Sequence, residues 1–325
     1  MLEMDPWVTI VVPSYNSGET IAAVLKGVLA QKFNGRYEIL VIDDCSIDQT
    51  VEICGSLGLK VFRNEKNIGL AASLNKGIAL SKSNVVVTLH ADATPLSENW
   101  LSQLVASLDR EDVGASCSLQ HSPDFNRPGF TIWEKFLWGR VLPHHALNNK
   151  ADAYKRRLFD EIGAFDAARF KTAGEDEDMG LRLRLNGWTL VGTAAEIQHN
   201  HRYAYKRGAG VFGRIMKKDY SFGRAGGALR RKFPRHRPGA FVYPEQKPFF
   251  NDGIFRAFVC IGSLVPFLQW ICIPSLAIMS VIGIRTVARR SHLRLTMPAY
   301  PFFNAIRYWC YTVGYLHGIF SGKQG

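Results

Sequence analysis

Four short apolar runs, mostly of β-branched residues, are separated in the first third of the chain by segments long enough to form helices. They cover residues 9–13, 39–42, 60–62 and 85–89. Strands that alternate with helices in this way predict a parallel sheet, and therefore an α/β fold. No Gly-x-Gly-x-x-Gly pattern follows the first run and the chain has no Walker loop, which argues against a dinucleotide dehydrogenase.

Polar side chains appear where these runs end. Ser14 and Asn16 follow the first run, Asp43 and Asp44 follow the second, and Asp92 stands just after the last. In an open α/β sheet, ligands bind outside the carboxyl ends of the strands, so we expect these side chains to line one cleft. For Asp43 and Asp44, a turn that caps the next helix is an equally good explanation.

Four consecutive acids, Glu175 to Asp178, stand immediately before a basic amphipathic segment. This pattern predicts a helix with an acidic first turn, which the helix dipole stabilises. A solvated first turn is one interpretation of such a run. The other is a site in which a carboxylate acts as a base.

Five ordered motifs carry a resemblance to a known family, and they cover residues 11–16, 41–50, 67–77, 89–93 and 174–178. In this order and at these distances they resemble the inverting glycosyltransferases of family 2. The resemblance extends from Thr9 to His201 and leaves the last third of the chain unmatched. It implies an α/β nucleotide-diphospho-sugar transferase fold, which is Rossmann-like and of the A type. We expect C-terminal membrane-associated helices in addition.

The resemblance implies a binding site for a UDP- or GDP-sugar donor. Pro13, Tyr15 and Asp44 would hold the base and the ribose, with Asp43 and Asp48 shaping that pocket. Carboxylates suit this task because the imino protons of uracil or guanine and the ribose hydroxyls all need an acceptor. The further donor-site residues that the third motif implies are Asn67, Gly69 and Asn75.

The fourth motif, His90-Ala91-Asp92, stands where the family has Asp-x-Asp, whose last carboxylate binds a divalent metal on the diphosphate. Asp92 is therefore expected to bind Mn²⁺ or Mg²⁺, since hard carboxylate and diphosphate oxygens suit these cations. His90 replaces the first acid, and it either contacts the donor or the metal or is merely tolerated at a strand end. His199 or His201 matches a family histidine near the diphosphate, and we favour His199 as the second ligand.

The acidic motif supplies the catalytic residues by the same resemblance. Asp176 is expected to be the general base that takes the proton of the acceptor hydroxyl, with Glu175 beside it. Glu175 and Asp178 are expected to orient the acceptor or the loop. Trp133 and Trp138 lie where the family builds acceptor contacts, although core packing is the commoner reason for a tryptophan.

These residues predict an enzyme that adds a sugar to a saccharide or a lipid-linked saccharide, in the assembly of cell-surface polysaccharide or glycolipid. One alternative is a polyprenyl-phosphate sugar synthase, whose acceptor is already ionised and needs no base. Another is a catalytically degenerate membrane scaffold, since His90 replaces an acid and Ser73 stands in place of an arginine. No Gln-x-x-Arg-Trp motif is present, which argues against a processive synthase.

Nearly the whole net charge of +12 lies in one segment. Residues 199–237 contain twelve Lys and Arg against one Asp, with aromatic residues between them. This composition suits an anionic membrane surface, and a solvated basic linker is the plain alternative. We expect no nucleic acid partner, because no nucleic-acid-binding motif accompanies the charge.

An uncharged run of 28 residues, 257–284, follows the basic segment. It exceeds the roughly 20 residues that a transmembrane helix needs, but Pro266 and Pro274 divide it into pieces too short to span. Basic residues lie on both sides, so a single crossing would leave one basic cluster on the wrong side. We predict a re-entrant hairpin, with a kinked span and a buried core hairpin as alternatives. The aromatic tail resembles a second interfacial helix.

The expected organisation has three parts. Residues 1–201 form the catalytic domain, residues 202–248 a basic aromatic interfacial segment, and residues 249–325 the hydrophobic membrane-associated helices. The six Cys show no metal-ligand spacing and the chain begins without a signal sequence, so reduced thiols are the simplest interpretation. The expected location is the cell membrane, with the catalytic domain on the cytoplasmic side.

Overall fold

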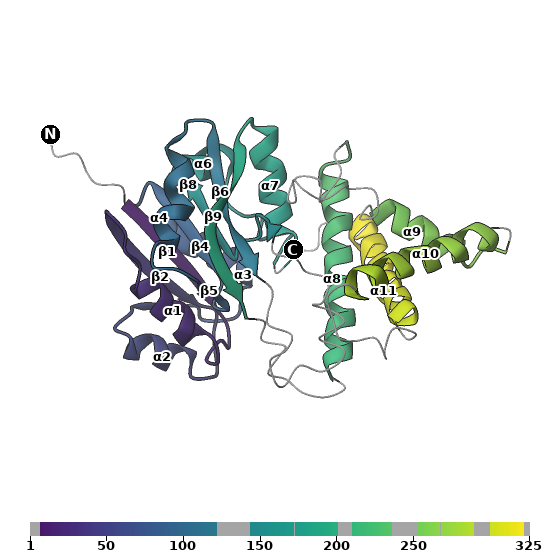
Figure 1. Ribbon diagram of the computed structural model, residues 1–325, viewed down its shortest axis with the longest axis horizontal. Helices are drawn as coiled ribbons and strands as arrows, with labels where there is room; N and C mark the ends of the chain where they lie inside the picture. Colours follow the sequence, from purple (N-terminus) through teal and green to yellow (C-terminus); the bar gives the residue numbers. More distant parts are fainter. Residues whose placement is uncertain are drawn as a thin grey trace. The chain divides into compact units, whose positions relative to one another are not determined.

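The computed structural model describes residues 7–121, 144–171, 173–200, 210–235, 253–266, 268–288 and 300–321. The chain divides into two compact units (Figure 1). The first comprises residues 1–123, 142–202 and 241–243, and the second comprises residues 124–141, 203–240 and 244–325.

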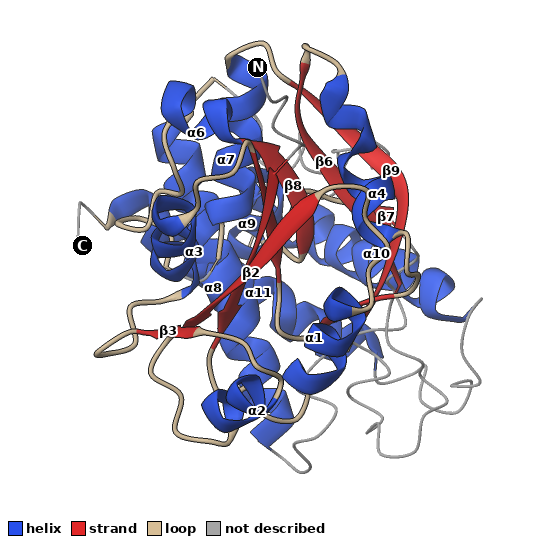
Figure 2. Cartoon of the chain, turned by 90° about the vertical axis from the view of Figure 1, so that its left-hand side faces the viewer, coloured by secondary structure: helices blue, strands red, loops and turns tan. Residues whose placement is uncertain are grey.

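One mixed sheet forms the centre of the first unit. Among the described residues nine strands build it in the order β3-β2-β1-β4-β8-β6-β9-β5, with β7 beside β6 (Figure 2). The four predicted strands are confirmed as β1 to β4, which pair in parallel. The strands are β1 Trp7–Ser14, β2 Arg36–Asp43, β3 Val61–Arg63, β4 Val85–Leu89, β5 Ala93–Pro95, β6 Val113–His121, β7 His144–His145, β8 Ala151–Lys155 and β9 Thr189–His199.

Helices cover both faces of this sheet because successive side chains of each strand point to opposite sides. Ile10 and Val12 of β1 belong to a core cluster with α1 and α4, whereas Val11 belongs to a second cluster with α3, α6 and α7. Figure 2 shows α3, α6 and α7 together on one side of the strands and α4 on the other. The helices are α1 Ile21–Leu29, α2 Thr50–Ser56, α3 Leu70–Leu80, α4 Trp100–Val105, α6 Arg156–Ile162 and α7 Glu175–Leu185, with a 3-10 helix at Ala106–Asp109.

The insertion of β8 next to β4 positions the second half of the site. β8 runs antiparallel to β4, with Leu89 opposite Ala151. The start of β8 therefore lies at the carboxyl end of β4. On the far side, β5 pairs with β9 and sets Ala93 opposite His199, which brings the end of β9 to the same motif.

The second unit is helical in its described part. It contains α8 Gly210–Lys232, α9 Gly253–Gly262, α10 Gln269–Ala288 and α11 Tyr300–Phe320. Residues 210–232 thus form a helix, so the alternative of a basic linker does not hold for them. The predicted break at Pro266 is confirmed, since α9 ends before it. The predicted break at Pro274 is wrong: α10 contains this proline, and Ser275 Oγ donates a 2.7 Å hydrogen bond to Ile271 O beside it.

Glycines bring α8 and α11 into backbone contact. A Cβ atom on Gly223 would lie 1.9 Å from the Tyr311 carbonyl oxygen, and one on Gly318 would lie 2.0 Å from that of Arg224. Arg307 of α11 also connects the two helices, because it donates hydrogen bonds of 2.6 and 2.8 Å to the carboxylate of Asp219 in α8. In the part of the chain that the structure describes, no helix has both the length and the apolar character required to cross a membrane.

Candidate active site

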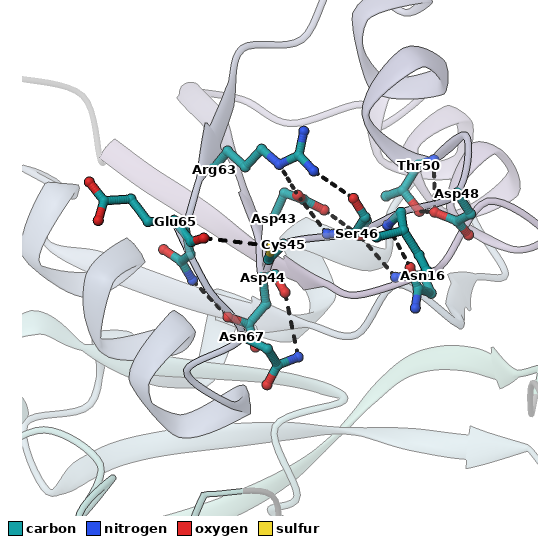
Figure 3. A network of polar contacts seen from close by, with 12 residues as sticks. Asn16, Asp43, Asp44, Cys45, Ser46, Asp48, Thr50, Arg63, Glu65 and Asn67 are labelled. Carbon is teal, nitrogen blue, oxygen red and sulfur yellow. Dashed lines mark hydrogen bonds and ion pairs between the residues drawn. The ribbon is translucent and has the colours of Figure 1, made fainter.

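The turn after β2 is built around Asp43. This fully buried carboxylate accepts a 3.1 Å hydrogen bond from the Ser46 amide and a further one from the Ser46 hydroxyl. The Arg63 side chain lies 3.4 Å from Asp43 and donates a 2.6 Å hydrogen bond to Ser46 O (Figure 3). The hydrogen bonds of Asp43 within the chain are therefore those of a turn-forming residue, which was one of the two interpretations of its sequence position.

Asp48 performs a related task one turn further on. Its carboxylate accepts from the Gly18 amide at 3.0 Å, and from the amide and hydroxyl of Thr50 at 3.1 and 2.5 Å. These bonds connect the loop after β1 to the start of α2. Asn16, which has a positive φ of 48°, completes the connection, because its side-chain Oδ1 accepts from the Ile47 amide at 2.9 Å.

Asp44 organises the loop that leads into α3. Its two oxygens accept three hydrogen bonds, from Asn64 Nδ2 at 2.9 Å and from the amides of Ile68 and Gly69 at 2.8 and 2.9 Å. Gly69 has a φ of +92°, and a Cβ atom there would lie 2.9 Å from Lys171 O. A carboxylate offers about four acceptor positions, so Asp44 retains room for about one contact with a ligand.

The other predicted donor-site residues differ in their exposure and in whether they hold the chain's own backbone. Asn67 lies beside Asp44, with its Nδ2 3.4 Å from the Asp44 carbonyl oxygen. Asn75 binds the backbone of Phe165 through both ends of its amide, at 2.8 and 2.9 Å, and so fastens α3 to the segment before α7. At the end of β1, Pro13 is buried and Tyr15 is 41% exposed.

Asp92 lies between two imidazole rings. His199 Nε2 is 3.5 Å from its Oδ2, and His90 Nδ1 is 4.0 Å from its Oδ1. Neighbouring ligands of an octahedral cation with bonds of about 2.1 Å lie roughly 3 Å apart, so Asp92 and His199 fit one such ion after a small adjustment. No group of three or more His, Cys, Asp and Glu within the described ranges could hold a metal. The pair instead suits a cation that takes its remaining ligands from a diphosphate and water.

The start of α7 concentrates four acidic groups, of which Glu175 and Asp178 are buried and Asp176 and Glu177 are half-buried. Burial raises the pKa of Glu175, and the charge of Asp176 raises it further. Burial also raises the pKa of Asp176, while the Glu177 amide and Lys150 act in the opposite direction. Burial and the charge of Asp176 raise the pKa of Glu177 to about 8. A carboxylate whose pKa is raised toward neutrality is a stronger base, which is the property that general base catalysis needs.

Asp178 has a structural partner within the same helix. The fully buried carboxylate accepts a 2.8 Å hydrogen bond from Arg182 Nε. The remaining nitrogens of Arg182 donate to the carbonyl oxygens of Ile162, Gly163 and Ala164. This ion pair fastens α7 to the loop after α6.

A polar turn before β8, residues 148–152, was not predicted. Asp152 Oδ2 accepts from the amides of Asn148 and Asn149 at 2.7 and 2.5 Å, and Tyr154 donates a 2.8 Å hydrogen bond to Asn149 Oδ1. Burial raises the pKa of Asp152 to about 7, with a further contribution from Asp176. The available signal in the sequence was one acid within the otherwise apolar start of a strand.

Some predicted residues fall outside the described ranges. They are Trp133, Trp138 and His201. The predicted acceptor contacts of the two tryptophans, and the choice between His199 and His201, therefore stay predictions. The roles assigned to Asp92, Asp176 and the nucleotide pocket also stay predictions. The structure does bring these residues to the carboxyl ends of the strands of one sheet.

A protein-family model describes half of this chain. The model of Glycosyl transferase family 2 matches residues 9–171. Curated relatives include a beta-monoglucosyldiacylglycerol synthase of Nostoc sp., 27% identical over 57% of this chain and 42% of that protein. Glycosyltransferase GlyG of Streptococcus pneumoniae is 21% identical over 67% of this chain and 75% of that protein. The match covers 25% of an uncharacterised Sinorhizobium fredii protein, y4gI, so the chain spans less than half of two of the relatives it matches.

Solved structures share the fold. A mannosyltransferase from Pyrobaculum calidifontis, in complex with GDP-Man and Mn²⁺, superposes with a TM-score of 0.60 at 17% identity, over 97% of this chain and 88% of that one. GalNAc-T7 with UDP, GalNAc and Mn²⁺ has a TM-score of 0.51 at 19% identity, over 71% of this chain and 51% of that one. Both are glycosyltransferases, and they confirm the expected A-type, Rossmann-like α/β fold of this chain.

Proposed function

Because this chain belongs to Glycosyl transferase family 2, we propose that it is an inverting, metal-assisted transferase that uses a UDP- or GDP-sugar. The acceptor is a saccharide or a lipid-linked saccharide, and the product belongs to cell-surface polysaccharide or glycolipid. The observation that carries the proposal is the position of Asp92, His199 and the α7 start at one edge of the sheet. The GDP-Man in one neighbouring structure and the UDP and GalNAc in the other agree with this donor, and the name of the Nostoc relative agrees with a lipid-borne acceptor.

The donor is expected to bind across the edge of the sheet. Asp44 and Tyr15 take the base and ribose, in a pocket that the turns of Asp43 and Asp48 hold in shape. Ser14 adds a buried hydroxyl at the end of β1 that has no hydrogen-bond partner in the described part of the chain. Asp92 and His199 would hold Mn²⁺ or Mg²⁺, which neutralises negative charge on the leaving diphosphate when bound.

Asp176 performs the proton transfer. The acceptor oxygen forms a bond to the anomeric carbon on the face opposite the diphosphate, and the bond from that carbon to the diphosphate oxygen breaks. The proton of the acceptor hydroxyl passes to Asp176, whose burial favours proton uptake. A single displacement of this kind inverts the anomeric centre.

The test measures the release of nucleoside diphosphate from a panel of UDP- and GDP-sugars by detergent-purified protein, with Mn²⁺, Mg²⁺ or EDTA. One donor is expected to turn over in the presence of metal, and Asp92→Ala is expected to abolish this turnover. Donor binding is read in the same samples, because a missing acceptor leaves binding intact. Absence of any metal-dependent binding of a nucleotide sugar would refute the proposal and favour a degenerate scaffold.

The surface of the second unit supports the proposal that the protein binds a membrane. Large apolar side chains of the α9–α10 hairpin face solvent, with Leu264 67%, Trp270 86% and Ile271 64% exposed. Helix α8 adds seven basic residues, while its one acid, Asp219, is already paired with Arg307. Apolar insertion combined with basic charge is typical of proteins that bind anionic bilayers. We place the catalytic unit on the cytoplasmic side of the cell membrane.

Vesicle co-sedimentation tests this placement. The protein is expected to bind vesicles that contain an anionic lipid more strongly than purely zwitterionic ones, and less strongly at high salt. Trp270→Ser combined with Leu264→Ser is expected to weaken binding, since it removes apolar surface available for insertion. Leu29→Ser, at a 45% exposed leucine of α1, serves as the matched control. Equal binding by the double variant and the wild type would contradict this role of the hairpin.

A further inference from the structure

Residues 163–171 lead from the end of α6 toward the first turn of α7, which carries Asp176. We call these residues the connector. They form neither a helix nor a strand, so contacts with neighbouring elements fix their path. Those contacts therefore determine where the acidic first turn of α7 lies.

Helix α7 itself holds the start of the connector. The guanidinium of Arg182 donates hydrogen bonds of 2.6, 2.8 and 2.9 Å to the carbonyl oxygens of Ile162, Gly163 and Ala164. Its Nε donates to the buried carboxylate of Asp178, one turn nearer the start of α7. The first turn of α7 and the start of the connector are thus bound to the same side chain.

Helix α3 holds the rest of the connector at two points. Asn75 Oδ1 accepts a 2.9 Å hydrogen bond from the Phe165 amide, and Asn75 Nδ2 donates one of 2.8 Å to Phe165 O. One turn earlier, the Ala71 amide donates to Lys171 O at 3.2 Å. Residues four apart lie on the same face of a helix, so one face of α3 carries both contacts.

The same end of α3 adjoins the pocket assigned to the nucleotide. The carboxylate of Asp44 accepts hydrogen bonds from the amides of Ile68 and Gly69, and Gly69 immediately precedes α3. A Cβ atom on Gly69 would lie 2.9 Å from Lys171 O. The loop that Asp44 organises therefore touches the connector directly, without room for a side chain between them.

We propose that Asn75 is a positioning residue, which holds the connector on α3 and thereby sets the place of Asp176 relative to the nucleotide at Asp44. The inference rests on the proposed function. It gives Asn75 a role other than the donor contact that its motif implies. General base catalysis needs the base within hydrogen-bond reach of the acceptor hydroxyl, and a misplacement of about 1 Å costs roughly a hundredfold in rate.

The variant Asn75→Ala removes both bonds to Phe165 and keeps a residue that favours helices. Donor affinity and the release of nucleoside diphosphate are measured in the same samples, with Mn²⁺ and the nucleotide sugar that the wild type turns over. The affinity is expected to stay within about twofold of the wild type. Release per donor-binding site, at saturating donor, is expected to fall by roughly tenfold to a hundredfold. Counting donor-binding sites removes unfolded protein from the comparison.

Arg169→Ala is the matched control within the connector. It removes a 2.7 Å hydrogen bond to Asp166 that lies inside the connector, and it leaves both contacts with α3 in place. It is expected to change neither the donor affinity nor the release per site. A fall equal to that of Asn75→Ala would show that any disturbance of the connector has this effect, and would contradict the role of α3.

Amide hydrogen exchange of the wild type tests the same coupling without a variant. UDP and GDP, each with Mn²⁺, are the probes. The nucleotide that binds is expected to slow exchange in the connector and in the first turn of α7, as well as in the loop of Asp44. Slowing confined to the loop of Asp44 would contradict the inference.

Two results with Asn75→Ala would also contradict the inference. Release per site equal to that of the wild type would show that the bonds to Phe165 do not position the base. A parallel fall in donor affinity would make Asn75 a donor contact instead. A wild-type protein that binds no nucleotide with metal would refute the proposed function, whereas a wild type that transfers as well as Asn75→Ala does would refute this inference alone.

Discussion

Two clusters of acidic residues lie at the same edge of the sheet and differ in how their hydrogen bonds are satisfied. In the turns after β2, Asp43, Asp44 and Asp48 accept hydrogen bonds from amides, hydroxyls and Asn64 of their own chain. In the α7–β8 region, Asp152 and Glu175 each retain one buried oxygen that has no partner among the described residues. Every carboxylate oxygen of the first cluster thus has a partner within the chain, whereas the second cluster has two described oxygens without one.

The two clusters therefore suit different tasks: the turns after β2 shape a pocket, and the α7–β8 region can take part in the reaction. A complete network fixes the loops that surround a nucleotide and stabilises the fold. Burial in the second cluster raises the pKa of Asp152, Glu175, Asp176 and Glu177, which makes ionisation costly. Such destabilised groups are typical of active sites, where the bound substrate supplies the missing interactions.

Asp152→Asn gives the largest expected change in stability. The pKa of Asp152 in the folded state, about 7, lies above the usual 3.8, so the folded protein binds the proton more tightly than the unfolded chain. The stabilising contribution of Asp152 is therefore fully present below about pH 4, falls as the pH rises through about 7, and is lost above it. Asparagine keeps an oxygen for the two amides and cannot ionise. At pH 8 the variant is expected to be more stable by up to about 4 kcal/mol.

Urea unfolding at pH 4 and pH 8 measures this effect. The advantage of Asp152→Asn should be small at pH 4 and large at pH 8. Asp160→Asn, the same substitution at an exposed position of α6, should change little at either pH. A variant that is less stable than the wild type at pH 8 would show that the ionised Asp152 is satisfied, and would remove the contrast between the two clusters.

Asp44→Ala is expected to have the next largest effect, in the opposite direction. It leaves the Ile68 and Gly69 amides and the Asn64 side chain without their acceptor. The expected loss is about 3 kcal/mol in the free energy of unfolding. Asp44→Asn keeps one acceptor oxygen and should lose less. An alanine variant as stable as the wild type would mean that the first cluster does not hold its loop.

Gly69→Ala should have the smallest effect of the series. Its φ of +92° disfavours any other residue, and the new Cβ would meet Lys171 O at 2.9 Å. We expect a loss of about 2 kcal/mol in thermal or urea unfolding. Gly55→Ala is the matched control, because Gly55 lies in α2 with open space around it and should gain about 0.5–1 kcal/mol. Equal changes in stability at the two positions would contradict the role given to the backbone conformation of Gly69.

The sequence predicted the parts of the site that local pattern determines. The first four strands and the polar residues at their ends follow from hydrophobic runs, which reflect burial on a sheet. The acidic start of α7 was also readable, because the helix dipole favours acids there. Asp43 and Asp44 could be interpreted as turn residues from their position after a strand.

The rest depends on pairing between distant segments. The insertion of β8 beside β4 brings Asn149 and Asp152 to the fourth motif, and no local signal reports that pairing. The bonds of Asn75 to Phe165 were likewise invisible, since they depend on how α3 packs against a distant segment. Pro274 was taken as a break because proline disfavours helix interiors, yet α10 continues through it.

The most direct test of the central claim measures donor affinity and transfer rate together in the wild type and in Asp176→Asn. The account predicts that the variant binds the metal-loaded nucleotide sugar with unchanged affinity, because the β2 turns and Asp92 are intact. Its transfer rate should fall by roughly a hundredfold to ten-thousandfold, the usual cost of losing a general base. Transfer at the wild-type rate, or loss of donor binding in parallel with transfer, would contradict the assignment of Asp176 as the base.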